Sequence, residues 1–91
     1  EVEALAAWDT KGGPALDAFR PEFVLISAGF DARQGDPLGG LNWEDETFEK
    51  LTQRVVTLAE KHASGRIVSV LEGGYNPEGL VAAVLAHLRE L

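Results

Sequence analysis

The stretch Phe23-Val-Leu-Ile-Ser-Ala-Gly-Phe-Asp31 decides the fold, together with its counterpart Arg66-Ile-Val-Ser-Val-Leu-Glu-Gly-Gly-Tyr75. Each begins with a short apolar run rich in β-branched residues and ends in turn residues. Apolar runs that do not alternate with polar residues are typical of strands buried on both faces, as in a parallel sheet. We therefore predict an α/β protein with parallel strands at about residues 23–28 and 66–71.

A helix-like stretch between the two predicted strands supplies the crossover that parallel strands require. Its apolar side chains recur at spacings of three and four residues, which is typical of an amphipathic helix. These side chains are Phe48, Leu51, Val55 and Leu58. We predict a helix from about Glu44 to His62, with Asn42 as its cap. After the second strand, Asn76 and Pro77 predict the cap and the first position of a final helix.

The N-terminal part of the chain is less regular. Residues 1–8 are rich in alanine and compatible with a helix, whereas Asp9-Thr-Lys-Gly-Gly-Pro14 is a cluster of helix breakers that predicts a turn. A short helix at residues 15–19 should follow. After the first strand, residues 29–41 form a loop rich in glycine and aspartate, and loops of this length are usually functional or disordered.

Length and composition limit the possible classes of protein. The chain has 91 residues, of which 45% are hydrophobic, and this suits one small domain with a core. A net charge of −7 argues against binding to nucleic acid, because phosphate-binding surfaces need clustered Lys and Arg. No apolar stretch is long enough to cross a bilayer, so we expect no membrane association. The lack of cysteine fits a reducing compartment, and we expect a cytoplasmic protein.

Two parallel strands are too few for a complete sheet of this kind. Two or three helices cannot cover both faces of the sheet and also protect both of its edges. We therefore expect residues 1–91 to form a single incomplete domain, as a fragment or module of a larger sheet whose other strands lie elsewhere. The alternative is an α/β miniature that is completed by dimerisation.

Asp31 and Tyr75 follow the ends of the two predicted strands. Ligands of parallel α/β sheets bind in the crevice outside the carboxyl ends of the strands, so we expect both side chains to face one crevice. A carboxylate held at a strand end after Gly29 suits a cation such as Zn²⁺, but an Asp in this position also fits an Asx-type turn. Tyr75 either donates a hydrogen bond to a developing oxyanion or closes over the sheet end with its hydroxyl in water.

The other chemically active residues favour structural roles. Asp36 lies between a glycine and a proline and is expected to form a turn. His62 and His87 should be helix-end or surface residues, because the first lies near the amino ends of the strands and the second lies well inside the last helix. Trp8 and Trp43 are expected to pack rather than to bind substrate. No Ser-His-Asp or Cys-His set can be assembled from these positions.

Two segments carry a resemblance to a known family. They are Phe19 to Gly40, with its Gly-Phe-Asp and Gly-Asp-Pro-Leu-Gly-Gly sequences, and Leu71-Glu-Gly-Gly-Tyr-Asn76. Their order and spacing resemble the C-terminal part of the histone deacetylase and acetylpolyamine amidohydrolase family, closest to its bacterial and class II-like members. The resemblance covers about residues 15–91, and residues 1–13 match it less well. It implies part of a three-layer α/β sandwich with a parallel sheet, of the arginase/deacetylase type.

The resemblance also implies an activity and its central residues. Members of the family hydrolyse acetyl-lysine or acetylated polyamine amides with one zinc ion, which is held by two aspartates and one histidine. The aspartate of the Gly-Phe-Asp motif is one of these ligands, and it corresponds to Asp31. The tyrosine of the Gly-Gly-Tyr motif corresponds to Tyr75, which would polarise the acetyl carbonyl and stabilise the oxyanion.

Four further residues would bind the substrate by the same resemblance. Pro37 and Leu38 would wall the channel for the acyl-lysine stem, and Gly73 and Gly74 would form part of its floor. The family's paired histidines and its Asp-x-His motif have no counterpart in the chain. We therefore expect the chain to need the remainder of the deacetylase domain for tight zinc binding and for hydrolysis. The alternative is a non-catalytic α/β binding or oligomerisation module derived from that fold.

Overall fold

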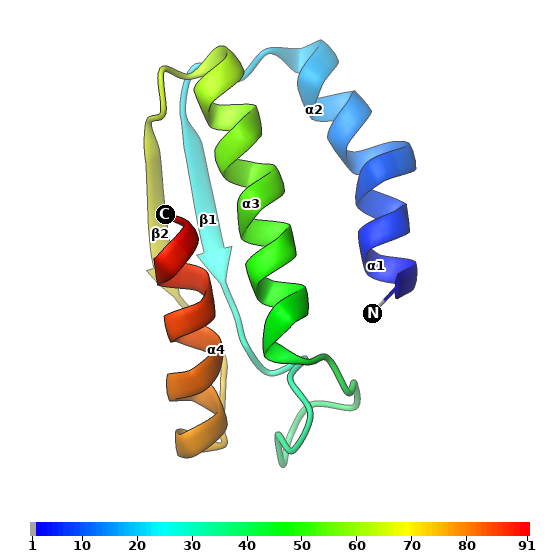
Figure 1. Cartoon of the computed structure of the whole chain (residues 1–91), viewed down its shortest axis with the longest axis vertical. Helices are drawn as coiled ribbons and strands as arrows, with labels where there is room; N and C mark the ends of the chain where they lie inside the picture. Colours follow the sequence, from blue (N-terminus) through cyan, green and yellow to red (C-terminus); the bar gives the residue numbers. More distant parts are fainter. Residues whose placement is uncertain (1) are drawn as a thin grey trace.

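The computed structural model describes residues 2–91 and contains a small parallel sheet with helices beside it (Figure 1). The strands are β1 (Val24–Ala28) and β2 (Ile67–Leu71), and they pair in parallel. The helical elements are α1 (Val2–Ala7), the π-helix η1 (Trp8–Gly12), α2 (Gly13–Phe19), α3 (Asp45–His62) and α4 (Pro77–Glu90). The α/β class and the parallel pairing are therefore confirmed. Within residues 2–91, no helix has both the length and the apolar character needed to cross a membrane.

The core lies between the sheet and the helix pair α3–α4. Its buried residues are Ala28, Phe30, Phe48 and Ala83, with Ile26, Ala32, Trp43, Leu80 and Val84 packed against them. The rings of Phe30 and Phe48 lie 5.2 Å apart between centroids, which joins the end of β1 to α3. The Trp43 ring packs against Phe48 in a tilted arrangement, with centroids 5.6 Å apart, so the prediction that it packs is confirmed.

Burial on both faces of the strands, which the apolar runs predicted, is wrong for this chain. Exposure alternates along β1 and β2, and the side chains on the face away from the core stay open. Leu25 is 69% exposed, and Val68 and Val70 are 45% and 49% exposed. The described helices cover one face of the sheet (Figure 1), so the apolar residues of the other face have no covering layer among residues 2–91.

The turn predicted at residues 9–14 is also wrong, because the chain stays helical from α1 through η1 into α2. The Gly13 N–H donates to the Trp8 carbonyl, so this turn is wider than an α-helical one. The wider turn accommodates Pro14, which has no N–H and would crowd the carbonyl of an α-helical turn. A Cβ on Gly13 would lie 2.9 Å from Trp8 Nε1, so glycine makes room for the indole. Glu1, where this helix was expected to begin, lies outside the described residues.

The two predicted helix caps have different outcomes. The Asn76 side chain accepts a hydrogen bond from the Gly79 N–H at 3.2 Å, so the predicted cap of α4 is confirmed. Asn42 does not cap α3, whose N-cap residue is Glu44. The preceding segment is extended because Trp43 forms a bridge to Arg33 in the loop after β1. This pairing moves the start of α3 past Asn42.

His87 lies in the last turn of α4, as a helix-end residue, but it is buried, with 6% of its surface exposed, so the surface alternative is wrong. Its ring lies between α4, α3 and β2, where Nδ1 is 2.8 Å from Thr52 Oγ1 and Nε2 is 2.8 Å from Ser69 Oγ. The Thr52 hydroxyl donates to the Phe48 carbonyl at 2.7 Å, so it can only accept from His87. This arrangement assigns the proton of the neutral ring to Nδ1, with Ser69 donating to Nε2.

The buried histidine gives the fold a pH dependence. Burial lowers the pKa of His87 below its ordinary value, so the folded chain binds this proton less readily than the unfolded chain. As pH falls from about 7.5 to 5.5, through the ordinary histidine pKa of about 6.5, the unfolded state gains the extra proton and the free energy of unfolding decreases. Urea unfolding at both pH values should show this decrease, and His87→Gln should reduce it. An equal decrease in both proteins would contradict this role of His87.

His62 is the last residue of α3, so its predicted helix-end position is confirmed. Its Nε2 lies 2.7 Å from Asp17 Oδ1, and Lys61 Nζ lies 2.8 Å from the same oxygen. Arg54 binds Asp9 at 2.7 Å on the same side of α3. The Asp17 pairs fix α2 against the C-terminal end of α3, and the Asp9 pair fixes η1 against the middle of α3.

Candidate functional site

Two segments leave the carboxyl edge of the sheet side by side. Ala28 pairs with Leu71 at the ends of β1 and β2. Beyond the strands, the Glu72 N–H donates to the Ala28 carbonyl at 2.9 Å, and the Phe30 N–H donates to the Gly73 carbonyl at 2.8 Å. The segments that carry Asp31 and Tyr75 therefore start from the same edge of the sheet.

The Asp31 carboxylate lies against two glycines. A Cβ on Gly73 would lie 3.1 Å from Asp31 Cγ, and a Cβ on Gly29 would lie 3.4 Å from Asp31 Oδ1. Among residues 2–91, this carboxylate makes no hydrogen bond or ion pair. The Asx-type turn that was the alternative for Asp31 is absent, and its oxygens are left for another partner.

Asp36 forms the turn instead, as predicted. Its Oδ1 accepts from the N–H groups of Leu38 at 2.8 Å and Gly39 at 2.9 Å. Its Oδ2 accepts from the Tyr75 N–H at 2.7 Å. Burial acts to raise the pKa of Asp36, but the backbone donors of Tyr75, Gly39 and Leu38 outweigh it and hold the pKa below its ordinary value.

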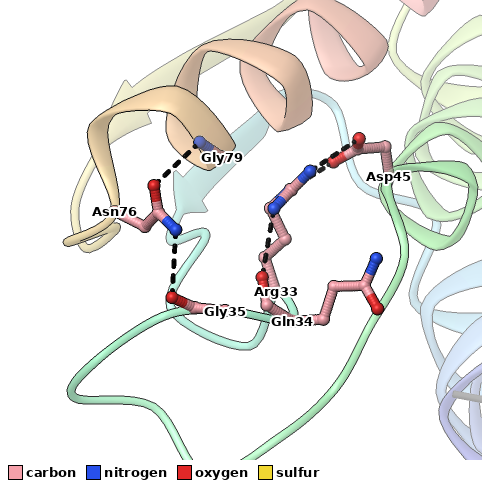
Figure 2. Close-up of polar contacts among 6 residues, drawn as sticks. All are labelled: Arg33, Gln34, Gly35, Asp45, Asn76 and Gly79. Atoms are coloured by element: carbon pink, nitrogen blue, oxygen red, sulfur yellow. Dashed lines mark hydrogen bonds and ion pairs between the residues drawn. The ribbon is translucent and has the colours of Figure 1, made fainter.

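A second set of polar contacts holds the same loop to α3 and α4 (Figure 2). The Arg33 guanidinium binds the Asp45 carboxylate through two bonds, at 2.6 and 3.1 Å. The Asn76 side-chain amide donates to the Gly35 carbonyl at 3.0 Å. A Cβ on Gly79 would lie 2.6 Å from Arg33 Nη1, so glycine lets the arginine lie against the first turn of α4.

These contacts between the loop and α4 were not predicted from the sequence. The partners are far apart along the chain, since Tyr75 lies 39 positions after Asp36 and Asn76 lies 41 positions after Gly35. Two sequence features bear on these contacts. The parallel strands bring both segments to one edge of the sheet. The first turn of α3 is acidic, but this did not identify Arg33 as a partner of Asp45.

The other predicted site residues lie at the surface of the two segments. Pro37 is exposed and Leu38 is 73% exposed, beyond the turn made by Asp36. Tyr75 is 51% exposed, and its phenol makes no hydrogen bond among the described residues. Gly73 and Gly74 are half-buried, and Gly74 has a φ of 141°, which favours glycine. That Asp31 and Tyr75 face one cavity stays a prediction.

No complete metal site forms within residues 2–91, because no three His, Cys, Asp or Glu side chains are grouped to hold an ion. Two cavities of about 380 and 360 Å³ lie beside the N-terminal helices. Neither is lined by Asp31 or Tyr75. Within residues 2–91, Asp31 and Tyr75 are therefore single groups on the segments that follow the sheet edge.

The structure is an α/β unit in which Asp31 and Tyr75 lie on the segments that follow the carboxyl ends of two parallel strands. The family model described as the histone deacetylase domain matches residues 2–91. The chain belongs to the histone deacetylase domain family. The matched range includes residues 2–13, which lie outside the motifs that carried the resemblance in sequence.

Curated relatives and solved structures agree with this assignment. Type-2 histone deacetylase 2 of Dictyostelium discoideum is 41% identical over a 90-residue alignment, and the match covers 96% of this chain and 5% of that protein. The histone deacetylase-like amidohydrolase of Pseudomonas aeruginosa is 41% identical over 78 residues, which are 86% of this chain and 20% of that protein. The crystal structure of the HDA15 HD domain superposes with a TM-score of 0.86 at 36% identity. The superposition covers 94% of this chain and 23% of that chain. The chain thus spans a fifth or less of the two curated relatives.

Proposed function

We propose that the chain forms part of the active site of a zinc-dependent deacetylase, which removes acetyl groups from acetyl-lysine or acetylpolyamines. Its membership of the histone deacetylase domain family supports the hydrolase class. The observation that carries the proposal is the Asp31 carboxylate, which is unpaired among residues 2–91 and lies against Gly29 and Gly73 at the sheet edge. The family resemblance assigns a zinc ligand to this position.

Asp31 suits zinc as one donor of a larger set. Aspartate oxygen is among the ligands that Zn²⁺ accepts, and no other group competes for this carboxylate within the described residues. A catalytic zinc site needs three protein ligands, so two would come from outside this chain. When bound, zinc would act as a Lewis acid on the carbonyl oxygen of the scissile amide.

Tyr75 would act on the same carbonyl oxygen. Its hydroxyl would donate a hydrogen bond that strengthens as negative charge develops on that oxygen, and one such donor contributes a few kcal/mol to catalysis. The phenol has no other hydrogen-bond partner within residues 2–91, so it is free to donate. The Tyr75 backbone is held by Asp36, which leaves the side chain to reach the substrate.

The substrate stem would lie along the exposed residues of the two segments. Pro37 and Leu38 would contact the methylene groups of an acetylated amine, and the exposed Leu38 side chain offers apolar surface for this contact. Gly73 and Gly74 would let the backbone approach the substrate closely, because neither carries a Cβ. Acetyl-lysine and acetylpolyamines share this stem, so both fit the proposal.

The isolated chain with Zn²⁺ and an acetyl-lysine peptide tests the claim that the chain holds only part of the site. We expect no turnover above that of Zn²⁺ in buffer, because Asp31 alone cannot form a catalytic zinc site. Product release is measured by mass spectrometry. Turnover that Tyr75→Phe abolishes would contradict the partial site, because the chain would then be a complete enzyme.

The positive control is a chimera with the histone deacetylase-like amidohydrolase of Pseudomonas aeruginosa. In this chimera, the 78-residue part of the chain that matches the amidohydrolase replaces the corresponding segment of that protein. The surrounding protein would supply the remaining ligands, and we expect the chimera to hydrolyse the same peptide. A folded chimera that binds zinc but is inactive would contradict the catalytic role proposed for this chain.

One observation favours a second candidate, a non-catalytic binding or oligomerisation module. The outer face of the β1–β2 sheet exposes Leu25, Val68 and Val70, which form an apolar surface suited to another protein layer. In the first proposal, this layer is the remainder of the deacetylase domain. In the second, it is a separate partner, and a chimera built as above would then fail to hydrolyse the peptide.

A further inference from the structure

Asp36 contacts both segments of the candidate site, although only one of its oxygens is needed for its own turn. Oδ1 binds the Leu38 and Gly39 amides, and Oδ2 binds the Tyr75 amide at 2.7 Å. We propose that Asp36 is a positioning residue that joins the Leu38 turn to the Tyr75 backbone, so that both keep a fixed relative position. The proposal rests on the proposed function only for the roles of Leu38 and Tyr75 toward substrate.

The chemistry of the side chain suits this role. Hydrogen bonds to an ionised acceptor are shorter and stronger than those between neutral groups, and a carboxylate has two acceptor oxygens. An asparagine would offer one acceptor oxygen and one donor amide. It could serve the Leu38 turn or the Tyr75 amide, but its NH₂ group would face the N–H donor of the other. Only an acidic side chain satisfies all three amides at once.

A neighbouring hydrogen bond also connects the loop after β1 to the segment after β2. The residue before Asp36 is Gly35, whose carbonyl accepts from the Asn76 side chain at 3.0 Å. Two consecutive residues of one segment thus bind two consecutive residues of the other. Gly35 has a φ of 81°, and a Cβ on it would lie 3.3 Å from Asn76 Nδ2, so glycine suits both the turn and the approach.

The turn also reaches the proposed metal ligand. The Gly39 amide binds Asp36, and a Cβ on Gly39 would collide with the Asp31 carbonyl oxygen. The Asp36 carboxylate therefore binds the Leu38 turn and the Tyr75 backbone, and Gly39 of this turn lies against the Asp31 backbone. Loss of the Oδ2 bond would separate Tyr75 from this group while the strands remain paired.

Hydrogen exchange of a single amide tests the proposal directly. Tyr75 is the only tyrosine of the chain, so labelling with ¹⁵N-tyrosine gives one amide signal. The variants are Asp36→Asn and Asp36→Ala, and Glu72→Gln is the matched control because its exposed carboxylate directly precedes the Gly-Gly-Tyr sequence. Valine amides of β1 and β2, labelled in parallel, report whether each variant remains folded, and uniformly ¹⁵N-labelled samples report the Leu38 and Gly39 amides.

In Asp36→Ala, we expect the Tyr75 amide to exchange at least about tenfold faster than in the unchanged chain, since its acceptor is lost. The strand valines should keep their exchange rates, and Glu72→Gln should match the unchanged chain at Tyr75. In Asp36→Asn, either the Tyr75 amide or the Leu38 and Gly39 amides should lose protection. Retained protection of all three amides in Asp36→Asn, or of Tyr75 in Asp36→Ala, would overturn the proposal.

A catalytic readout in the chimera separates positioning from simple stability. Asp36→Ala, which removes the Oδ2 bond to Tyr75, should lower kcat at least about tenfold because it acts on the placement of Tyr75, and KM should rise because the Leu38 turn is lost as well. In a Tyr75→Phe background the same change should lower kcat less than twofold. Equal losses in both backgrounds would contradict action through Tyr75. An inactive chimera together with the expected exchange result would contradict the proposed function but would still support the positioning role of Asp36.

Discussion

Replacing Tyr75 by phenylalanine in the Pseudomonas chimera is expected to lower kcat by about 10²- to 10³-fold, with KM nearly unchanged. The substitution removes one hydroxyl and keeps the ring, so packing around residue 75 is preserved. The lost hydrogen bond forms mainly when the carbonyl oxygen gains negative charge, and it therefore stabilises the transition state more than the bound substrate. Steady-state kinetics on an acetyl-lysine peptide measure both constants.

The matched control for this prediction is Glu78→Gln in the same chimera. Glu78 is exposed in the first turn of α4, three residues after Tyr75, and its side chain makes no hydrogen bond or ion pair within residues 2–91. Its replacement should leave kcat within about twofold. A Tyr75→Phe chimera with the full kcat, or one in which only KM rises, would show that the phenol does not act in the chemical step.

Much of the fold follows from short-range sequence signals. The two apolar runs predicted the parallel strands because both are continuous, β-branched and bounded by turn residues. Asn76 followed by Pro77 predicted the start of α4, since a cap and a proline favour the same position. Because parallel strands end at one edge, these signals also placed Asp31 and Tyr75 on neighbouring segments.

The errors arise where distant contacts override local preferences. Gly12, Gly13 and Pro14 disfavour an α-helix, but a π-helical turn against Trp8 accommodates them. His87 is polar and lies in a helix with two apolar sides, so its burial depends on Thr52 and Ser69, which no local pattern reveals. Apolar strands predict two covering layers, but the sequence pattern does not say whether one chain supplies both.

The contacts that hold the candidate site residues could not be predicted from the sequence. The family motifs singled out Asp31 and Tyr75, whose roles stay predictions, and the turn-forming role assigned to Asp36 missed its bond to Tyr75. Glycines and aspartates in a loop allow many turns, and the choice among them depends on which amides the folded chain brings near. Arg33 and Asn76 were missed for the same reason, because their partners lie on other elements.

The second large effect concerns Asp31 and metal binding. In the chimera, Asp31→Asn should weaken zinc binding by more than about 10²-fold, because loss of a hydrogen-bond partner behind a ligand already costs about 10- to 100-fold. The substitution keeps the shape of the side chain and removes its charge. The control is Asp17→Asn, since Asp17 binds His62 and Lys61 at the far end of α3.

The most direct measurement is the zinc content of the purified chimeras by atomic emission spectroscopy after dialysis against a weak chelator. We expect about one zinc per molecule for the unchanged chimera and for Asp17→Asn, as for a single-zinc site. We expect almost none for Asp31→Asn. Full zinc content in a folded Asp31→Asn chimera would show that this carboxylate is not a ligand and would contradict the account.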